Sequence, residues 1–126
     1  MKNVTISNKT ELIDEFDDVT ILFADIAGFT KYSSSVEPKE VVSMLRMLFT
    51  EFDMSCYSHN VYKMYTIGDC YVIMGFINAN KRNPFQDAKN VIKMGFSMIK
   101  LIKKVKKAIK FKDLQMRIGI HTVYIF

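Results

Sequence analysis

Two aspartates stand where apolar segments of the chain end, a position from which they could support metal-dependent chemistry. Asp25 follows the apolar run Val19–Ala24. Asp69 lies between two further apolar runs, Val61–Ile67 and Cys70–Phe76. Paired carboxylates at neighbouring strand ends suit two divalent cations, which in turn bind the phosphates of a nucleoside triphosphate. The simpler alternative is structural: Asp25 caps the next turn, and Asp69 is a residue favoured in hairpins.

The hydrophobic pattern predicts the elements that must position these two residues. Their order is strand–helix–strand–strand–helix–strand, which is typical of an α+β fold with a ferredoxin-like βαββαβ core. Such a core has an antiparallel sheet and two long helices on one face. The predicted strands are residues 18–25, 61–67, 70–76 and 116–122, and the helices run from a cap at Ser34 to about Ser58 and from Phe85 to about Ala108.

This topology predicts that Asp69 comes to lie beside Asp25. A right-handed crossover makes the second strand parallel to the first. The third strand then returns antiparallel between them, so the Gly68–Asp69 turn lies next to the end of the first strand. Apolar residues on both faces of the first strand also predict a central strand that is covered on each side.

The start of the first helix and the buried face of the second are predicted from spacing. Ser34 and Glu37 have the spacing of a capping box, and Pro38 suits an early helical position. The expected buried stripe of the second helix consists of Phe85, Ala88, Val91, Ile92, Gly95, Ile99, Ile102 and Val105.

Composition narrows the class of protein. The 126 residues are 49% hydrophobic and 25% charged, which fits one globular domain. No apolar run is long enough for a membrane helix, and the N-terminus does not resemble a secretory signal. Two cysteines without a CxxC motif favour a reducing compartment. The net charge of +5 includes a lysine run at residues 100–112, which could bind nucleic acid or anionic lipid but more ordinarily forms a solvated helix face.

Three motifs in order resemble the class III nucleotidyl cyclases, the adenylyl and guanylyl cyclases. FADIAGFT at residues 23–30 is similar to the family's first metal motif, F-x-D-I-x-G-F-T. VYKMYTIGDCYV at 61–72 resembles the hairpin that carries T-I-G-D, and RIGIHT at 117–122 resembles the start of R-I-G-I-H-T-G. The residues of the hairpin motif slightly favour the guanylyl type. The family's ferredoxin-like core agrees with the topology predicted above.

The resemblance implies a two-metal active site at an interface between two cyclase domains. Asp25 and Asp69 would be the catalytic residues holding two Mg²⁺ or Mn²⁺ ions, with the Ile26 carbonyl completing one metal site. GTP, or alternatively ATP, would be converted to a 3′,5′-cyclic nucleotide and pyrophosphate, which makes the enzyme a phosphorus–oxygen lyase. The residues implied to contact phosphate are Ala27, Gly28, Phe29 and Thr30.

Departures from the family pattern predict dependence on a partner. Tyr65 stands where guanylyl cyclases carry a purine-reading Glu and adenylyl cyclases a Lys. Val123 replaces an expected glycine, and the chain contains no counterpart of the downstream Asn-x-x-x-Arg pair. We therefore expect residues 1–17 to be a lead-in or linker and residues 18–126 a catalytic domain incomplete at its C-terminus. Alone it should be inactive, and its partner would be a second cyclase domain, as a homodimer or heterodimer or within one longer chain.

Other interpretations remain open at this point. The chain could be an inactive cyclase-like domain that serves dimerisation or regulation, or another two-metal enzyme with a similar core. An RNA-recognition module shares the element order, but the third strand CYVIMGF lacks the pattern of such modules, so we expect no nucleic-acid partner. The expected location is the cytoplasm, or the cytosolic face of a membrane as part of a larger protein.

Overall fold

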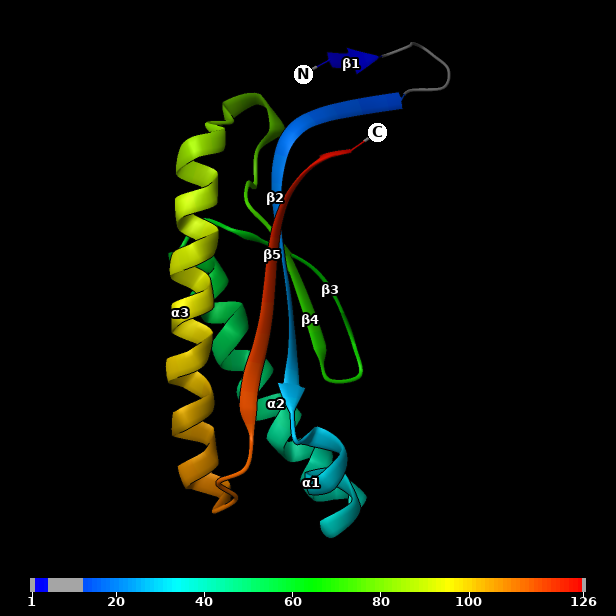
Figure 1. The fold of residues 1–126 in the computed structure, drawn as a ribbon, viewed down its shortest axis with the longest axis vertical. Coiled ribbons are helices and arrows are strands. Elements are labelled where there is room, and N and C mark those ends of the chain that lie inside the picture. Colours follow the sequence, from blue (N-terminus) through cyan, green and yellow to red (C-terminus); the bar gives the residue numbers. More distant parts are fainter. Residues whose placement is uncertain (1, 5–12, 126) are drawn as a thin grey trace.

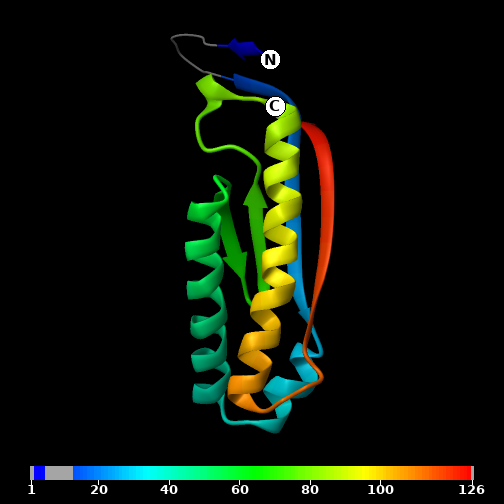
Figure 2. The ribbon, with the colours of Figure 1, turned by 90° about the vertical axis from the view of Figure 1, so that its left-hand side faces the viewer.

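The computed structural model describes residues 2–4 and 13–125 and has two layers, a twisted sheet and a pair of long helices. Both long helices pack on the same face of the sheet (Figures 1 and 2). None of the helices in these ranges combines the length and hydrophobicity needed to cross a bilayer. The elements are β1 (Lys2–Val4), β2 (Ile13–Ala27), α1 (Phe29–Ser35), α2 (Pro38–Ser58), β3 (Tyr62–Ile67), β4 (Cys70–Met74), the 3₁₀ turn Ala79–Lys81, α3 (Pro84–Ile109) and β5 (Gln115–Ile125).

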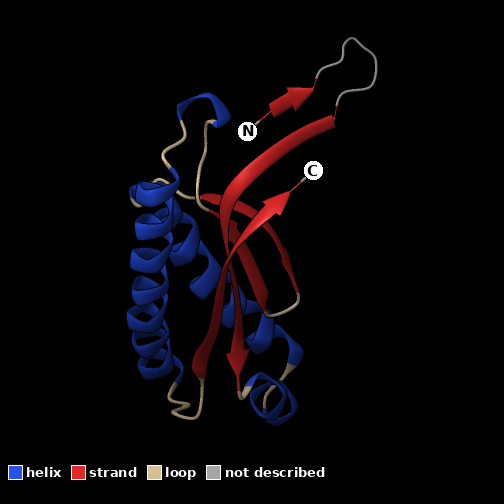
Figure 3. Ribbon diagram, turned by 45° about the horizontal axis from the view of Figure 1, so that its top comes forward, coloured by secondary structure: helices blue, strands red, loops and turns tan. Residues whose placement is uncertain are grey.

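The sheet has the predicted ferredoxin-like topology. Its main part is ordered β5–β2–β4–β3, and β4 pairs antiparallel with both β2 and β3. β5 pairs antiparallel with the other edge of β2. Since β2 and β3 are both antiparallel to β4, they are parallel to each other, as the crossover rule requires. Figure 3 shows the strands as one layer beside the helices.

β2 begins earlier than predicted, at Ile13 instead of residue 18. The register of its pairing with β5 shifts between Phe16 and Val19, and Asp18 has a positive φ of 55°. Such a bulge interrupts the two-residue alternation by which a strand is recognised in a sequence. The first part of β2 pairs with β1, and β5 continues through residue 125, beyond the predicted residue 122.

The core fills the space between the sheet and the two long helices. Buried side chains alternate along the end of β2 from Leu22 to Ile26, three consecutive side chains of β4 are buried, and those of α2 recur at helical spacing. The main contributors are Leu22, Ala24, Ile26, Tyr71 and Ile73 from the sheet, Met44, Leu48, Phe52 and Cys56 from α2, and Val91, Met94, Met98, Ile102 and Val105 from α3.

The buried face of α3 differs from the predicted stripe. Phe85 is 74% exposed, and Ile92 and Ile99 are also exposed, whereas Met94 and Met98 are fully buried. Gly95 does face the sheet as predicted, and a Cβ there would lie in ordinary van der Waals contact, 3.5 Å from Leu22. The flexible methionines on either side then fill the irregular space below the helix, which a stiff β-branched residue would fill less well.

The prediction that β2 is covered on each side is wrong. Among the described elements, both long helices lie on one face, and we call the opposite face of the sheet the open face. On it Phe23 is 42% exposed and Tyr65 is 45% exposed, and Tyr62 on β3 is exposed as well. The apolar side chains of β2 therefore face the core on the helix-covered side of the sheet and are uncovered on the open face.

The predicted capping box is also wrong, because an unpredicted helix, α1, occupies its first residue. Ser34 lies inside α1, where its hydroxyl donates a hydrogen bond to the Thr30 carbonyl at 3.0 Å. Glu37 is the N-cap of α2 by its extended backbone, without a side-chain cap. Pro38 is the first residue of α2, whereas the predicted capping box would begin the helix at residue 35.

Gly28 should tolerate no side chain. Its φ is +87°, and a Cβ at this position would overlap the Asp113 carbonyl oxygen. Gly28→Ala should therefore lower the free energy of unfolding by about 2 kcal/mol or more, through backbone strain and displacement of the 113 loop. Chemical denaturation would measure the loss.

Gly119 offers the matched control for this substitution. Apart from its chain neighbours, no described atom lies within 4 Å of the position that a Cβ would take there, and its φ is not positive. Gly119→Ala should stay within about 0.5 kcal/mol of the parent. Equal losses from the two substitutions would contradict the role given to the Asp113 contact.

Candidate active site

A hydrogen bond joins the β3–β4 turn to the end of β2. The backbone N–H of Ile26 donates to Asp69 Oδ2 at 3.2 Å. The β2–β4 ladder runs as far as the pair Ala24–Tyr71, and the Asp69 carboxylate accepts the next N–H of β2 in place of a backbone carbonyl. The predicted proximity of Asp69 to the Asp25 end of β2 is therefore confirmed, and Asp69 is more than a turn residue.

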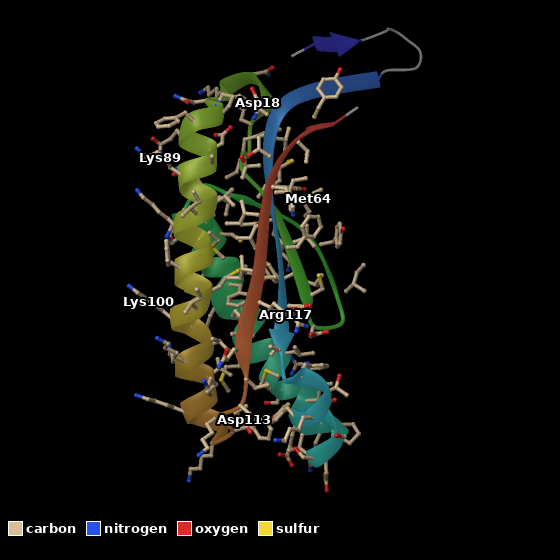
Figure 4. All side chains as sticks on the ribbon, in the orientation of Figure 1. Asp18, Met64, Lys89, Lys100, Asp113 and Arg117 are labelled. Carbon is tan, nitrogen blue, oxygen red and sulfur yellow. The ribbon has the colours of Figure 1, made fainter. Side chains whose placement is uncertain are left out.

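Asp25 is held from the other side by an arginine of β5. Asp25 and Arg117 are directly paired in the β2–β5 register. Arg117 Nε donates to Asp25 Oδ1 at 3.0 Å, and Nη2 donates to Oδ2 at 3.3 Å. These hydrogen bonds and the charge of Asp25 raise the pKa of Arg117 above its ordinary value. Figure 4 places Arg117 at the level of the β3–β4 turn.

Sequence reasoning did not predict this ion pair, nor does Asp25 cap the following turn. The N-cap of α1 is Gly28, and no side chain caps it. The pairing of Asp25 with Arg117 depends on the register of β2 and β5, which the hydrogen bond between Thr20 and Thr122 at 2.9 Å also reflects. The available signal was the opposite charge of residues on neighbouring strands, which attract when they face each other.

The implied phosphate-binding residues form the turn between β2 and α1. Gly28 is in the left-handed conformation, and the Tyr32 N–H donates to its carbonyl at 3.0 Å as the first bond of the helix. The amides of Phe29 and Thr30 precede that bond, so they have no acceptor within the helix. Free amides at this place can donate to an anion.

Buried Tyr71 and two exposed charged residues connect the hairpin to α2. Tyr71 is fully buried, and its hydroxyl donates to Asp53 Oδ1 of α2 at 2.6 Å. Lys63 Nζ lies 3.0 Å from the same oxygen and 5.4 Å from the centre of the Tyr71 ring. Burial, followed by the bond to Asp53, raises the pKa of Tyr71. These contacts therefore connect β3 and β4 to α2. Tyr71, which makes one of them, lies only two residues after Asp69 in the sequence.

Comparison with known proteins identifies the family. The profile of the adenylate and guanylate cyclase catalytic domain matches residues 12–125. The chain belongs to this family. It is 38% identical over 117 residues to guanylate cyclase alpha of Plasmodium falciparum, covering 90% of this chain and 3% of that protein. It is 40% identical over 108 residues to the human guanylate cyclase soluble subunit alpha-2, covering 86% of this chain and 14% of that protein. The class III cyclase resemblance, of guanylyl type, is thus confirmed.

Solved cyclase domains share the fold. The guanylate cyclase domain of RhGC from Catenaria anguillulae, in complex with GTP, superposes with a TM-score of 0.77 at 30% identity, covering 90% of this chain and 60% of that one. The adenylyl cyclase CyaB from P. aeruginosa has a TM-score of 0.79 at 23% identity, with 89% and 59% covered, which speaks for the fold alone. The chain thus spans about three fifths of these solved domains and a small part of its full-length relatives.

In this cyclase domain, Tyr65 stands apart from the two aspartates. It lies on β3 after a register shift between Lys63 and Tyr65, and it pairs with Val72 of β4. Within residues 18–124 the structure records no hydrogen bond between Tyr65 and Asp25 or Asp69. Its half-exposed ring belongs to the open face, so a ligand or partner on that face would meet it.

The residues of the cyclase domain fit divalent cations that share their coordination with a substrate. Across the described ranges, no three His, Cys, Asp or Glu side chains gather into a metal site. Asp25 and Asp69 offer only oxygen, the ligand type that Mg²⁺ and Mn²⁺ prefer. Mg²⁺ is commonly held by one or two carboxylates together with substrate phosphates. In this structure the Arg117 guanidinium occupies both carboxylate oxygens of Asp25.

Cys70 should report on the charge of the site. It lines a cavity of about 310 Å³ together with Phe23, Asp25 and Arg117. Burial, then the charges of Asp25 and Asp69, raise the pKa of the Cys70 thiol. Asp69→Asn should remove one of these charges and lower that pKa. In a Cys56→Ala background, alkylation of Cys70 by iodoacetamide near neutral pH should become about two- to five-fold faster, because the thiolate fraction rises.

A charge-neutralising change far from the thiol provides the control for that measurement. Glu51 is an acid of α2 that pairs with Lys104 of α3. Glu51→Gln should leave the alkylation rate unchanged. An Asp69→Asn variant that reacts no faster than the parent would contradict the electrostatic coupling between Asp69 and Cys70.

Proposed function

We propose that this domain forms a 3′,5′-cyclic nucleotide and pyrophosphate from a nucleoside triphosphate, with GTP favoured and ATP the alternative. The observation that carries the proposal is the hydrogen bond from the Ile26 N–H to Asp69, which brings a second carboxylate to the end of the strand that carries Asp25. The family match adds that relatives with this fold bear the name guanylate cyclase.

Asp25 and Asp69 would hold two Mg²⁺ or Mn²⁺ ions, and the Ile26 carbonyl would complete one of the sites. When bound, such ions supply Lewis-acid activation of the ribose 3′-hydroxyl and neutralise charge on the triphosphate. The 3′-oxygen then bonds to the α-phosphorus, its proton is lost, and the bond from that phosphorus to the pyrophosphate oxygen breaks.

The turn after β2 would orient the triphosphate. The Phe29 and Thr30 amides, together with the Thr30 hydroxyl, are donors suited to phosphate oxygens. Ala27 and Gly28 complete this turn, and the left-handed backbone of Gly28 leads directly into the amides of α1. Arg117 neutralises Asp25 in this structure, so a cation that binds Asp25 must compete with the guanidinium for the same two oxygens.

A second cyclase domain would complete the site across the open face. Charge that develops on the phosphates needs a cationic donor such as arginine, which the partner domain would supply. The exposed Phe23 and Tyr65 on the open face suit burial by a partner. One similar structure is described as a dimeric guanylyl cyclase domain, from the RhoGC fusion protein of Blastocladiella emersonii. We therefore propose a homodimer or heterodimer, inactive as a lone domain, in the cytoplasm or on the cytosolic face of a membrane.

Loss of either aspartate should abolish turnover without unfolding the domain. With a partner cyclase domain and Mn²⁺, Asp25→Asn and Asp69→Asn should each reduce cyclic nucleotide formation by about 100-fold or more, because each removes a charged metal ligand. Chromatographic detection of cyclic GMP and cyclic AMP measures the loss, and Glu51→Gln serves as the charge-matched control. Undiminished turnover in either aspartate variant would overturn the two-metal assignment. A folded dimer of the parent chain that forms no product with any partner would instead favour a regulatory cyclase-like domain.

Tyr65 should influence base preference. A carboxylate accepts hydrogen bonds from the guanine N–H groups, which a phenol can accept only weakly. Tyr65→Glu should therefore raise the ratio of kcat/KM for GTP over ATP by about 10-fold or more. Tyr62→Glu, at another exposed tyrosine of the same strand, should leave that ratio unchanged. An equal shift in both variants would show that added negative charge, and not position 65, sets the preference.

A further inference from the structure

The positive charge of the chain is concentrated in one segment. Residues 100–112 contain seven lysines and no acidic residue, whereas the rest of the chain has 11 basic and 13 acidic residues out of totals of 18 and 13. The whole net charge of +5 therefore depends on this segment. It covers the last turns of α3 and the start of the loop that leads to β5.

These lysines converge around a surface cavity. Lys103 lies three and four residues before Lys106 and Lys107, and these two lie four and three residues before Lys110, so all four lie on one side at the end of α3. Their side chains, with those of the following loop, line a cavity of about 630 Å³. The lining residues are Lys103, Lys106, Lys107, Lys110, Phe111 and Lys112. We call this set the lysine patch.

The charge of the lysine patch is not neutralised within the described part of the chain. Lys104, beside the patch, pairs with Glu51 at 3.1 Å. No lysine of the patch has a carboxylate within 4 Å among the described residues. Like charges three and four residues apart on a helix repel, and the negative end of the helix dipole compensates only partly. A set of cations held together without acidic partners is suited to an external polyanion.

The lysine patch lies away from both the termini and the open face. The C-terminal end of α3 is at the opposite end of the molecule from the labelled termini (Figures 1 and 2). In Figure 4, Lys100 points away from the sheet, and Asp113 marks the loop after α3. A second domain on the open face would therefore leave the lysine patch accessible.

We infer that the lysine patch binds the phosphate headgroups of an anionic membrane surface. Clusters of four to eight basic residues on an amphipathic helix are typical of such binding. Lysine stems can lie along the apolar wall of the cavity while their ammonium groups reach the headgroup oxygens. This binding concerns a surface separate from the proposed active site, so it does not depend on cyclase activity.

Nucleic acid fits the lysine patch less well. The patch contains no arginine, so it lacks the planar guanidinium that reads bases and phosphates in pairs. Its one aromatic ring, Phe111, packs edge-on against Tyr32 with ring centres 5.0 Å apart. That ring is committed to the core and offers no free platform on which a base could stack.

Binding of the chain to lipid vesicles tests the inference. The chain should co-sediment with phosphatidylcholine vesicles that contain phosphatidylserine and not with pure phosphatidylcholine vesicles, and added salt should weaken the binding. The variant with Lys103, Lys106, Lys107 and Lys110 all changed to Gln should bind about 100-fold more weakly. Changing the same four residues to Arg should preserve binding, because the charge is retained, and thermal unfolding checks that both variants fold.

A variant with the same net charge separates the patch from charge in general. Changing Lys39, Lys81, Lys89 and Lys93 to Gln also removes four positive charges but leaves the lysine patch intact. This control should bind the anionic vesicles within about two-fold of the parent. Equal losses in the two Gln variants would overturn the inference. Tighter binding to duplex DNA than to vesicles, or displacement from vesicles by low concentrations of inorganic pyrophosphate, would likewise overturn it by identifying another polyanion.

Discussion

The position of β4 between β2 and β3 is the constraint on which the site depends. Because β4 runs antiparallel to both neighbours, its preceding turn must lie at the end of β2, and the Ile26 N–H then finds the Asp69 carboxylate at 3.2 Å. The same bond satisfies a backbone donor that would lack a ladder partner, so one side chain both ends the sheet pairing and brings an acid to the site. Tyr71 and Asp53 hold the hairpin from the core side.

Two carboxylates close together repel each other unless a cation neutralises at least one of them. In this structure Arg117 of β5 neutralises Asp25 through two hydrogen bonds. Arg117 is largely exposed and Asp25 is partly exposed, and such a solvent-accessible ion pair contributes only about 1 kcal/mol or less to stability. The arginine can thus neutralise Asp25 without holding it irreversibly, which is the property that a metal-binding carboxylate requires.

Topology and the identity of the two acids could be predicted from the sequence, whereas details set by packing could not. Chain order and the right-handed crossover rule suffice to bring Asp69 to Asp25, since they need no side-chain geometry. The Asp25–Arg117 pair depends on strand register, and the burial of Met94 and Met98 depends on how α3 is rotated on the sheet. The bulge before Val19 concealed the early start of β2. Propensity alone cannot determine any of these, because tertiary contacts decide them.

The two faces of the sheet differ in role: one packs against the helices, and the other carries Asp25. The helix-covered face holds the buried side chains, including Tyr71, and gives the domain its core. The open face exposes Phe23, which lines one cavity with Asp25, and also Tyr65 on β3. Exposed aromatic side chains on a sheet gain stability when another surface removes them from water. In the dimer proposed above, the apolar surface that a partner would cover thus lies on the same face as Asp25.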